Sequence, residues 1–433
     1  MQIIIIHHHL NPGGVSRIIQ SQVNSLKNQF PDTEILLLSG KAPDHDFFKD
    51  RGVKVRVKPE LNYLLNQDYT VEFLEAMQKD LSEFLRKNIQ RDSLIHAHNM
   101  NLGKNPVLML ALSEMAADGY RLFNHCHDFA EDRPANFEFL KNIIQTKLGQ
   151  DLQKVLYPSY PNYLFGTLND FDRRRIFKEG IPESRVVFLP NPVHFEAKKH
   201  FAKSDAKRVI CQALQLDEDK MLITYPVRVI RRKNIGELIL LSILFEDQAH
   251  WLVTQPPKNP IELVDYKKWK QLCSRLKIPL VFEAGTRVDF EQLLVASDVC
   301  ISTSVREGFG MVFLEPWLLS TPVMGRNISY VTEDLKKSGV CFPLLYEAIK
   351  VGLKNGAHDF GALDVQVQQE IIKQIRNDED EKEKIKKMNP QLETLFRPVG
   401  DLLIKKNKEI IKSKYSLKNY AERLHEIYRK LAQ

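Results

Sequence analysis

Two glutamates and two glycines in the range Val305–Pro316 have a spacing that suits the binding of a phosphorylated ligand. Glu307 stands before Gly308 and Gly310, and Glu315 stands after them. The range is expected to join a strand to a helix, and ligands of open parallel sheets bind outside the carboxyl ends of the strands. Glycines let backbone N–H groups approach an anion, and a helix N-terminus attracts negative charge. The carboxylates would hold hydroxyl groups of an extended ligand; the alternative is that the glycines only shape a tight turn.

A basic segment, Pro226–Asn234, follows the first expected strand of the second half. It contains Arg228 and Lys233, with Arg231 and Arg232 between them. A departing nucleotide diphosphate develops negative charge, and fixed cations stabilise such a transition state more than the ground state. The segment therefore suits phosphate binding, and the alternative is an ordinary basic loop.

Histidines and glycines follow the expected strands of the first half. His96 and His98, like His125 and His127, alternate along a strand, so both imidazoles of a pair lie on one face. Such pairs either bind a metal or are simply hydrogen-bonded. Because no acidic or cysteine ligand stands at a suitable spacing, we expect no metal. Gly14 belongs to a Gly-Gly turn before the first helix, which by itself indicates only a turn.

These residues lie on an alternation of strands and helices that predicts βαβ units and parallel sheets. In the first half the expected strands are 3–7, 35–39, 53–57, 94–97, 122–126, 155–158 and 186–189. In the second half they are 222–227, 251–254, 280–283 and 300–303. Helices are expected at 15–27, 71–87, 107–116, 236–245 and 290–297, and from near Met311.

A length of 433 residues and this alternation predict two α/β domains. We expect a first domain at 1–195 and a second at 205–400, with a linker near the start of the polar segment 194–220. A closing amphipathic helix at 416–433 is expected to begin at Ser416, a good N-cap, and to pack on another part of the protein.

Composition is that of a soluble globular protein, with 43% hydrophobic and 27% charged residues. No apolar run is long enough to span a bilayer, and no signal peptide is expected. Five scattered cysteines without a CxxC argue against a disulfide framework or zinc site and favour a reducing cytoplasm. The net charge of +7, much of it from lysines after residue 370, predicts a solvated helical surface or, alternatively, contact with an anionic membrane. No nucleic-acid-binding motif accompanies this charge.

The run from Glu307 to Glu315 resembles the E-x7-E motif of retaining GT-B glycosyltransferases, particularly those of family 4. The resemblance implies that Glu307 lies beside the donor sugar hydroxyls and that Glu315 binds the ribose hydroxyls. It also implies that the intervening loop, with Gly308, Phe309 and Gly310, contacts the sugar and diphosphate.

Other segments resemble this family in the order in which its motifs occur. Pro226–Asn234 resembles the family's G-R-x4-K-G segment, although Val227 and Asn234 replace its glycines. Arg228 and Lys233 match the two cations that neutralise the diphosphate.

In the first half, the turn at Gly14 resembles the glycine-rich turn that faces the donor phosphates, and His127 resembles a strand-end histidine that contacts the donor sugar. Asp128 and Arg133 follow this histidine and are expected to face an acceptor, Arg133 suiting an acidic or phosphorylated one; the alternative is a solvated loop. The family's closing helix crosses back onto the first domain, so the same is expected of 416–433.

The resemblance implies a GT-B fold, in which two Rossmann-like domains face each other across a cleft. The implied reaction is metal-independent transfer of a hexose, with retention, from a nucleotide diphosphate sugar to an unidentified acceptor, with no cofactor. UDP-glucose and GDP-mannose are the foremost donors. One alternative is a GT-B phosphorylase or a GT-B epimerase; an epimerase should need an acid/base carboxylate cluster in the first domain, and none is evident. The other is a catalytically silent protein that binds sugar nucleotides or partners.

Overall fold

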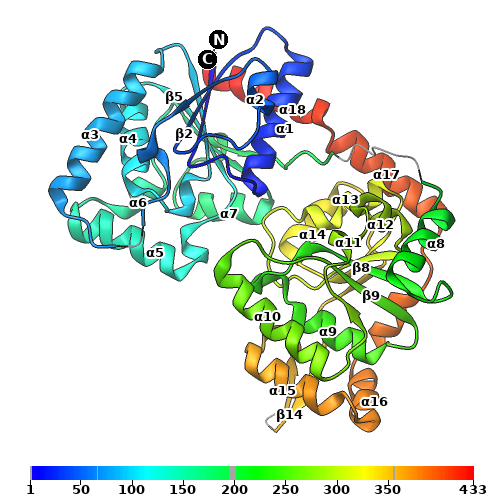
Figure 1. Cartoon of the computed structure of the whole chain (residues 1–433). Helices are drawn as coiled ribbons and strands as arrows, with labels where there is room; N and C mark the ends of the chain where they lie inside the picture. The colour runs from blue at the N-terminus through cyan, green and yellow to red at the C-terminus, as the bar shows by residue number, and fades with distance from the viewer. Residues whose placement is uncertain (1, 66, 195–200, 355) are drawn as a thin grey trace. The chain divides into compact units, whose positions relative to one another are not determined.

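The chain folds into two compact units, which we describe separately. The computed structural model describes residues 2–65, 67–194, 201–354 and 356–433. The first unit comprises Met1–Pro192 with Tyr415–Gln433, and the second comprises Val193–Lys414. Each contains a parallel sheet flanked by helices (Figure 1). The linker predicted near residue 194 falls largely on 195–200, outside the described residues, and the rest of the polar segment includes a helix, α8 (Lys203–Leu214).

The first unit has a seven-stranded sheet of order β3-β2-β1-β4-β5-β6-β7, in which every neighbour pairs in parallel. Its strands are β1 (Gln2–His7), β2 (Glu34–Ser39), β3 (Lys54–Val57), β4 (Leu94–His98), β5 (Arg121–Cys126), β6 (Tyr163–Thr167) and β7 (Val186–Phe188). Its helices are α1 (Gly14–Gln29), α2 (Phe47–Asp50), α3 (Val71–Asn88), α4 (Pro106–Ala117), α5 (Pro134–Lys141), α6 (Leu152–Leu156), α7 (Asp170–Lys178) and α18 (Leu417–Ala432).

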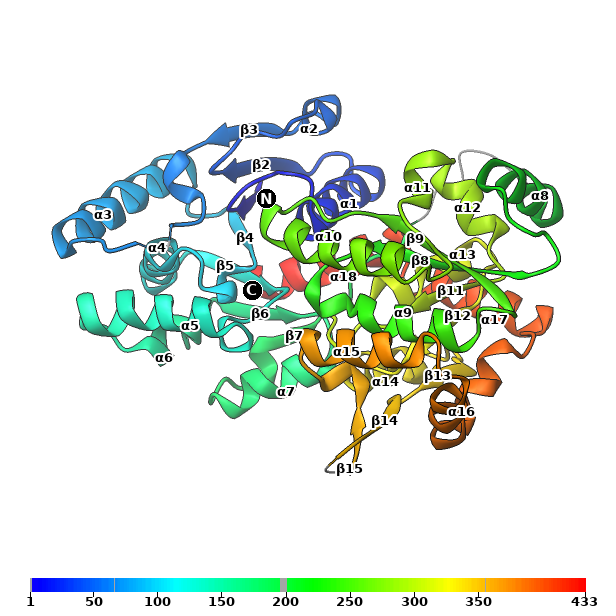
Figure 2. The same cartoon turned by 60° about the horizontal axis from the view of Figure 1, so that its bottom comes forward.

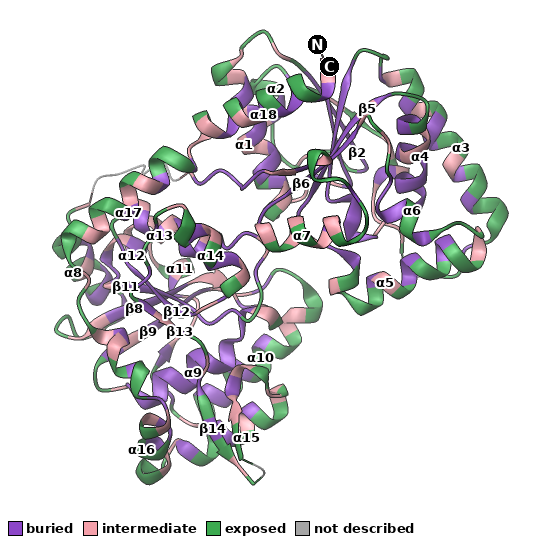
Figure 3. Cartoon of the chain, turned by 180° about the vertical axis from the view of Figure 1, so that it is seen from behind, coloured by how far each residue is buried: buried purple, intermediate pink, exposed green. Residues whose placement is uncertain are grey.

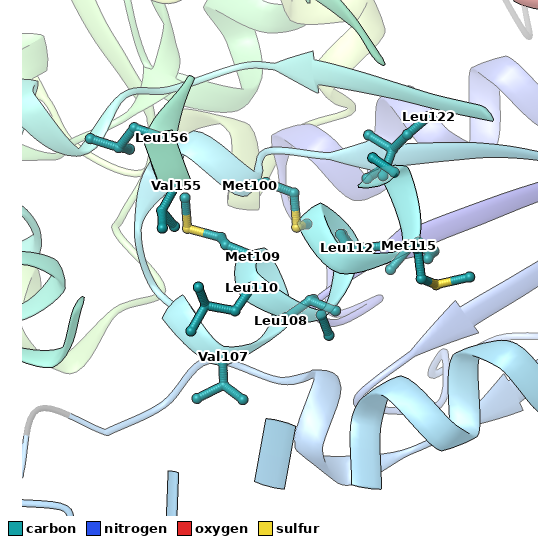
Figure 4. Packing of buried hydrophobic residues seen from close by; sticks show 14 of the residues in the cluster. Met100, Val107, Leu108, Met109, Leu110, Leu112, Met115, Leu122, Val155 and Leu156 are labelled. Carbon is teal, nitrogen blue, oxygen red and sulfur yellow. The ribbon is translucent and has the colours of Figure 1, made fainter. Parts of the chain in front are cut away.

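Helix α4 shows how this unit buries its core. Its sequence is apolar nearly all round, from Val107 to Leu112 and again at Met115 and Ala116, and these side chains are buried. Figure 4 shows them packed with neighbours from α6 and β5. Helix α3, by contrast, buries one stripe and exposes the rest (Figure 3). A helix that is hydrophobic all round is expected in a core.

One predicted strand of the first unit is wrong and one real strand was not predicted. The run 155–158, expected as a strand, belongs to helix α6 and the turn after it. Asp151 caps this helix by accepting from the backbone N–H of Gln153, at 3.0 Å, and of Lys154, at 3.4 Å. The strand is β6 instead. Periodicity does not distinguish a short buried strand from a short buried helix.

The second unit has a six-stranded parallel sheet of order β10-β9-β8-β11-β12-β13 and an antiparallel hairpin, β14-β15 (Figure 2). The strands are β8 (Met221–Arg228), β9 (Ala249–Gln255), β10 (Leu280–Val281), β11 (Val299–Ser302), β12 (Val323–Arg326), β13 (Leu344–Tyr346), β14 (Lys350–Leu353) and β15 (Gly356–Asp359). Its other α-helices are α9 (Ile235–Leu244), α10 (Pro260–Arg275), α11 (Ala284–Arg287), α12 (Phe290–Ala296), α13 (Glu315–Leu318), α14 (Ser329–Lys337), α15 (Val365–Ile375), α16 (Glu379–Met388) and α17 (Asp401–Lys414).

Two features of this unit differ from the sequence prediction. The strand expected at 280–283 ends at Val281, because Glu283 adopts a left-handed conformation, φ 60°, before α11. Strands β12, β13, β14 and β15 were not predicted. They are three or four residues long, too short for a pattern to be visible.

The closing helix α18 begins after Ser416, whose side chain accepts from the N–H of Asn419 at 3.3 Å. Its apolar stripe, which includes Tyr428, joins the core of the first unit. All five cysteines are free thiols. Among the described helices, none is both long enough and apolar enough to cross a membrane.

Candidate functional site

The strand order of the second unit marks where a ligand site is expected. Strands β9 and β10 lie on one side of β8, and β11, β12 and β13 lie on the other. The winding therefore reverses between β8 and β11, and crevices at the carboxyl ends of such strands bind ligands in open α/β sheets. Arg228 ends β8, Arg231–Lys233 follows as a 3-10 turn, and Glu307 follows β11. The basic segment and the first glutamate of the motif thus meet at this reversal.

Glu307 lies between two cations. Its Oε1 binds the Lys233 ammonium, and its Oε2 is 2.7 Å from a guanidinium nitrogen of Arg232. That guanidinium also donates to the carbonyl of Arg306 at 2.8 Å. The Glu307 and Lys233 side chains are only 6% and 10% exposed, whereas that of Arg232 is 40% exposed. A buried carboxylate is thus paired with one buried and one half-exposed cation.

This arrangement keeps the carboxylate charged. Burial alone would raise the pKa of Glu307, but Lys233 and Arg232 outweigh it and hold that pKa below its usual value. Burial lowers the pKa of Lys233, with Glu307 opposing and Arg232 assisting. Two neighbouring cations with one carboxylate leave local positive charge, which suits an anionic ligand.

The backbone of both partners is held by hydroxyl groups of neighbouring side chains. Tyr225 and Thr303 donate to the carbonyl of Lys233, the latter at 3.0 Å. The hydroxyl of Tyr330, on α14, accepts from the N–H of Glu307 at 3.0 Å and lies 2.9 Å from its carbonyl. The carboxylate and ammonium are therefore positioned by β8, β11 and α14 together.

Asn234, where the family usually has glycine, adopts a left-handed conformation with φ 52° and begins α9. Asparagine tolerates this conformation better than most residues. Its amide donates to Glu237 at 3.2 Å and accepts from Gln368 at 3.3 Å. Glu237 is itself buried against Arg326, so these contacts hold the turn after Lys233.

The glycine turn is required by the packing of the chain itself. Gly310 has φ 80°, and a Cβ there would lie 2.7 Å from Val331 and 2.9 Å from Phe313. The side chain of Phe309 is buried. Gly308 lies between Phe309 and Glu307 in the same bend.

The helix predicted from near Met311 is wrong in detail. A 3-10 turn, Met311–Phe313, ends at Leu314, and the four-residue α13 begins at Glu315. Glu315 therefore opens a helix rather than lying one to two turns inside one. Pro316 fits this boundary, because it lacks the N–H that would continue a helix from the preceding turn and is tolerated in the first turn of α13. No long helix begins within residues 311–318, which the structure describes, so the predicted helix N-terminus for binding an anion is missing there.

The strand order of the first unit reverses between β1 and β4, because β2 and β3 lie beyond β1. Histidines cluster at the carboxyl ends of the strands there: His7 on β1, His96 and His98 on β4, and His125 and His127 on and after β5. The rings of His96 and His98 are stacked with centroids 4.3 Å apart. His98 Nδ1 lies 3.0 Å from His127 Nε2, and His96 Nε2 lies 3.4 Å from His125 Nδ1. The sequence pattern did not indicate that His7 belongs to this cluster.

All of these imidazoles are neutral at pH 7. Burial lowers the pKa of His125 to about 3, and the Leu189 backbone carbonyl opposes it. Burial also lowers the pKa of His96, His98 and His127 far below the usual value, with repulsion from neighbouring histidines adding to it. Neutral imidazole is the form that binds metal.

Ring nitrogens of His96, His98 and His125 lie within 4.8 Å of one another, close enough to share a metal ion. Spacing along the sequence does not reveal this set of three, because His125 lies on the strand next to that of His96 and His98. The described hydrogen bonds already engage His96 and His98 at both ring nitrogens.

Asn99 orders the loop that follows His127. Its side-chain oxygen accepts from the N–H of His127 at 3.3 Å and of Asp128 at 2.8 Å. Asp128 pairs with Arg133 at 2.7 Å, and both side chains are partly exposed. The sequence carried no signal for Asn99, since its partners are 28 and 29 residues away.

Gly14 is the first residue of α1. Among the described residues, none would lie within 4 Å of a Cβ at this position and none caps the helix with its side chain; the first turn has no acidic residue. The turn is fixed by Ser16, whose hydroxyl donates to the carbonyl of Asn11 at 2.7 Å. Open space beside an uncapped helix N-terminus suits an anion.

No protein-family model matches the chain. A mannosylglucosyl-3-phosphoglycerate synthase from Petrotoga mobilis is 30% identical over 347 residues. The aligned region covers 77% of this chain and 66% of the synthase, so the chain spans just under two thirds of that relative's length.

Solved structures of glycosyltransferases resemble the whole chain. Anabaena Alr3699/HepE in complex with UDP-glucose has a TM-score of 0.62, with 99% of both chains covered and 16% identity. Sucrose-phosphate synthase from Thermosynechococcus elongatus has a TM-score of 0.62, with 99% of this chain and 98% of that one covered at 15% identity. A glycosyltransferase from Rickettsia africae has a TM-score of 0.63, covering 100% and 98% at 15% identity. These likenesses confirm the predicted α/β GT-B fold with two Rossmann-like units.

Proposed function

Because this chain has the GT-B glycosyltransferase fold and is related in sequence to a glycosyl-phosphoglycerate synthase, we propose that it is a retaining glycosyltransferase. It transfers a hexose from a nucleotide diphosphate sugar to an acidic acceptor. The observation that carries this proposal is the cluster of Glu307 with Lys233 and Arg232 at the β8–β11 reversal. A carboxylate for sugar hydroxyls and cations for phosphate stand together where this fold class binds ligands.

In the proposed mechanism Lys233 serves two partners. An ammonium carries three N–H donors, so one can hold Glu307 while another binds a phosphate oxygen. Arg228, half-buried at the end of β8, supplies a second cation for the departing diphosphate. Both stabilise negative charge that is larger in the transition state than in the bound donor.

Glu307 orients the sugar and stabilises positive charge at its anomeric carbon, and His127 binds a sugar hydroxyl. In the first unit, the uncapped N-terminus of α1 at Gly14 offers backbone N–H groups that suit an anion. A covalent route needs a second carboxylate beneath the anomeric carbon. The motif pairs no such acid with Glu307, so we favour attack from the front face, with the departing phosphate accepting the acceptor's proton. No metal or cofactor enters this scheme.

The acceptor proposal rests on the relative's name and on two cations. That name describes a product with mannosyl, glucosyl and 3-phosphoglycerate groups. In this chain Arg133 is half-exposed, and burial and the charge of Arg133 lower the pKa of Lys104. An acceptor with carboxylate or phosphate would relieve this repulsion. Asp128, which pairs with Arg133, would then exchange its partner for the acceptor.

The proposal is tested by incubating the purified chain with GDP-mannose or UDP-glucose, with and without glucosyl-3-phosphoglycerate. We expect one donor to be consumed only when the acceptor is present. Arg133→Ala should raise the acceptor KM about tenfold, as expected for a lost charged hydrogen bond, while the donor KM is unchanged. Binding of a donor without any turnover would support the silent-protein alternative, and consumption without an acceptor would support an epimerase.

The stereochemistry of the product tests retention. Both donors carry an α-linked sugar, so the product should be an α-glycoside. Proton NMR of the first-formed product reports this through the anomeric coupling for glucose, or through carbon–proton coupling for mannose. A β-linked product would contradict the retaining mechanism and the roles assigned to Glu307 and His127.

A further inference from the structure

A buried glutamine bonds both His96 and His98 and so joins the His96–His125 and His98–His127 contacts into one hydrogen-bond chain. Gln22, on α1, is fully buried, and its Oε1 lies 2.8 Å from His98 Nε2. Its Nε2 lies 2.8 Å from His96 Nδ1 and donates to the Tyr428 hydroxyl at 2.8 Å. That hydroxyl is 2.6 Å from the same His96 nitrogen. With the contact between His98 and His127, the chain runs from α18 through α1 and β4 to the end of β5.

The amide determines which ring nitrogen carries each proton. The Gln22 amide nitrogen can only donate, so Nδ1 of His96 accepts. The His96 proton is therefore on its other ring nitrogen, Nε2 of His96. The Gln22 Oε1 only accepts, so His98 carries its proton on Nε2 and has a lone pair at Nδ1. That lone pair accepts from His127, which places the His127 proton on Nε2.

His127 is therefore left with a lone pair at Nδ1. Among the residues that the structure describes, none bonds to this nitrogen, while Nε2 is engaged by His98. Its backbone N–H is held by Asn99. An imidazole fixed at its backbone and at one nitrogen presents the other nitrogen in a defined direction and in one role, as a hydrogen-bond acceptor.

We propose that Gln22 is a positioning residue, which fixes the tautomer of His98 and through it that of His127, so that His127 Nδ1 accepts a hydrogen bond from a donor-sugar hydroxyl. The sugar contact rests on the function proposed above, whereas the tautomers do not. The titratable groups beside this hydrogen-bond chain are His7 and His125. His7, on β1, has its Nδ1 3.3 Å from the His98 carbonyl. Both are neutral, so no fixed charge competes with the amide.

Nitrogen-15 NMR of histidine-labelled protein at neutral pH tests the tautomers directly, because protonated and unprotonated ring nitrogens have well-separated shifts. We expect His96, His98 and His127 to carry the proton on Nε2, and His7 to carry it on Nδ1. Protons on Nδ1 of His96, His98 and His127 would show that the amide is reversed and would overturn the proposal. A stoichiometric transition metal whose removal by chelator changes these shifts would also overturn it, because a metal-bound nitrogen carries no proton.

Gln22→Met removes both amide functions at nearly constant volume. We expect the His127 tautomer to become mixed and kcat to fall about tenfold, with a smaller change in donor KM. Tyr428→Phe removes only the far end of the chain and should lower kcat by about threefold with the His127 tautomer kept. Tyr420→Phe is the matched control on the same helix, because the buried Tyr420 hydroxyl has no hydrogen-bond partner among the described residues. This control should leave both kcat and the His127 tautomer unchanged.

An unaltered His127 tautomer in Gln22→Met would overturn the proposal even if activity fell. If Gln22→Met does not fold, the proposal is still tested by the tautomers of the wild-type protein and by the kcat and His127 tautomer of Tyr428→Phe. If the wild-type protein transfers no sugar, the proposed function fails, and the NMR pattern alone decides whether Gln22 holds His127.

Discussion

The two units bury polar side chains at equivalent places of their sheets, but in opposite electrostatic states. At the β1–β4 reversal, neutral imidazoles are joined by hydrogen bonds through Gln22. At the β8–β11 reversal, Glu307 is joined by ion pairs to Lys233 and Arg232. Neutral groups can be buried once they are hydrogen-bonded, whereas buried charges need a charged partner. The stability of the histidine cluster should therefore depend on its protonation. The stability of the Glu307 cluster should depend on keeping both the carboxylate and its cations.

The largest effect should come from pH, and it should separate the two clusters. The folded pKa of the first unit's buried histidines is lowered, so their contribution to stability is full above the unfolded value of 6.5 and is lost as pH falls. Each contributes up to about 1.4 kcal/mol less by pH 5.5. Glu307 also has a lowered pKa, so its contribution is lost only below its ordinary value of 4.5.

Hydrogen exchange followed by mass spectrometry at pH 7.5 and 5.5 measures this difference. After correction for intrinsic exchange rates, protection should fall in β4 and β5 and persist in β8 and β11. Equal loss in both sheets would mean that the histidines do not control acid stability.

Glu307→Ala should have the next largest effect. It leaves the buried Lys233 ammonium without its carboxylate, which destabilises a protein by about 3–5 kcal/mol. Turnover should fall on the order of a hundredfold or more. Urea unfolding and initial rates measure the two quantities. The double variant Glu307→Ala/Lys233→Met should recover part of the stability but none of the activity; additive losses would contradict a coupled pair.

Arg228→Ala tests phosphate binding more than folding, whereas Lys233→Met also removes the buried partner of Glu307 and should lower stability as well as turnover. Each should lower turnover on the order of a hundredfold, which corresponds to about 2.7 kcal/mol. Lys270→Met is the matched control, because Lys270 pairs with Glu283 at 3.0 Å but its side chain is 46% exposed. Near wild-type turnover in both site variants would move the phosphate assignment to Arg231 and Arg232.

Arg232→Met should have the smallest effect on stability. Its guanidinium is 40% exposed, and ion pairs of exposed groups contribute about 1 kcal/mol or less. Raising the salt concentration should reduce the difference between Arg232→Met and wild type, because exposed charges are screened. The effect of Lys233→Met should persist at high salt, so equal salt sensitivity would contradict the difference in burial.

Sequence alone predicted the fold class and most of the strands, because period and spacing are local properties. It also predicted that Lys233 and Glu307 both follow strands of one parallel sheet, whose carboxyl ends share an edge. It did not predict their contact, since 74 residues separate them and which strands are neighbours depends on the order of the sheet. The short elements α6 and β12 were not predicted, for another reason. Tertiary packing overrides the weak local pattern of so short a segment.

Packing also determined what the motif residues do. The sequence placed Glu315 inside a helix, but Pro316 breaks the chain's helical path and Glu315 begins α13. The sequence marked His127, yet the hydrogen-bond chain that orients it depends on Gln22, which is 76 residues from His98. Residue type and local spacing determine which groups are available for chemistry. Charge state, tautomer and partner arise from burial and from contacts between distant segments, which only the tertiary structure brings together.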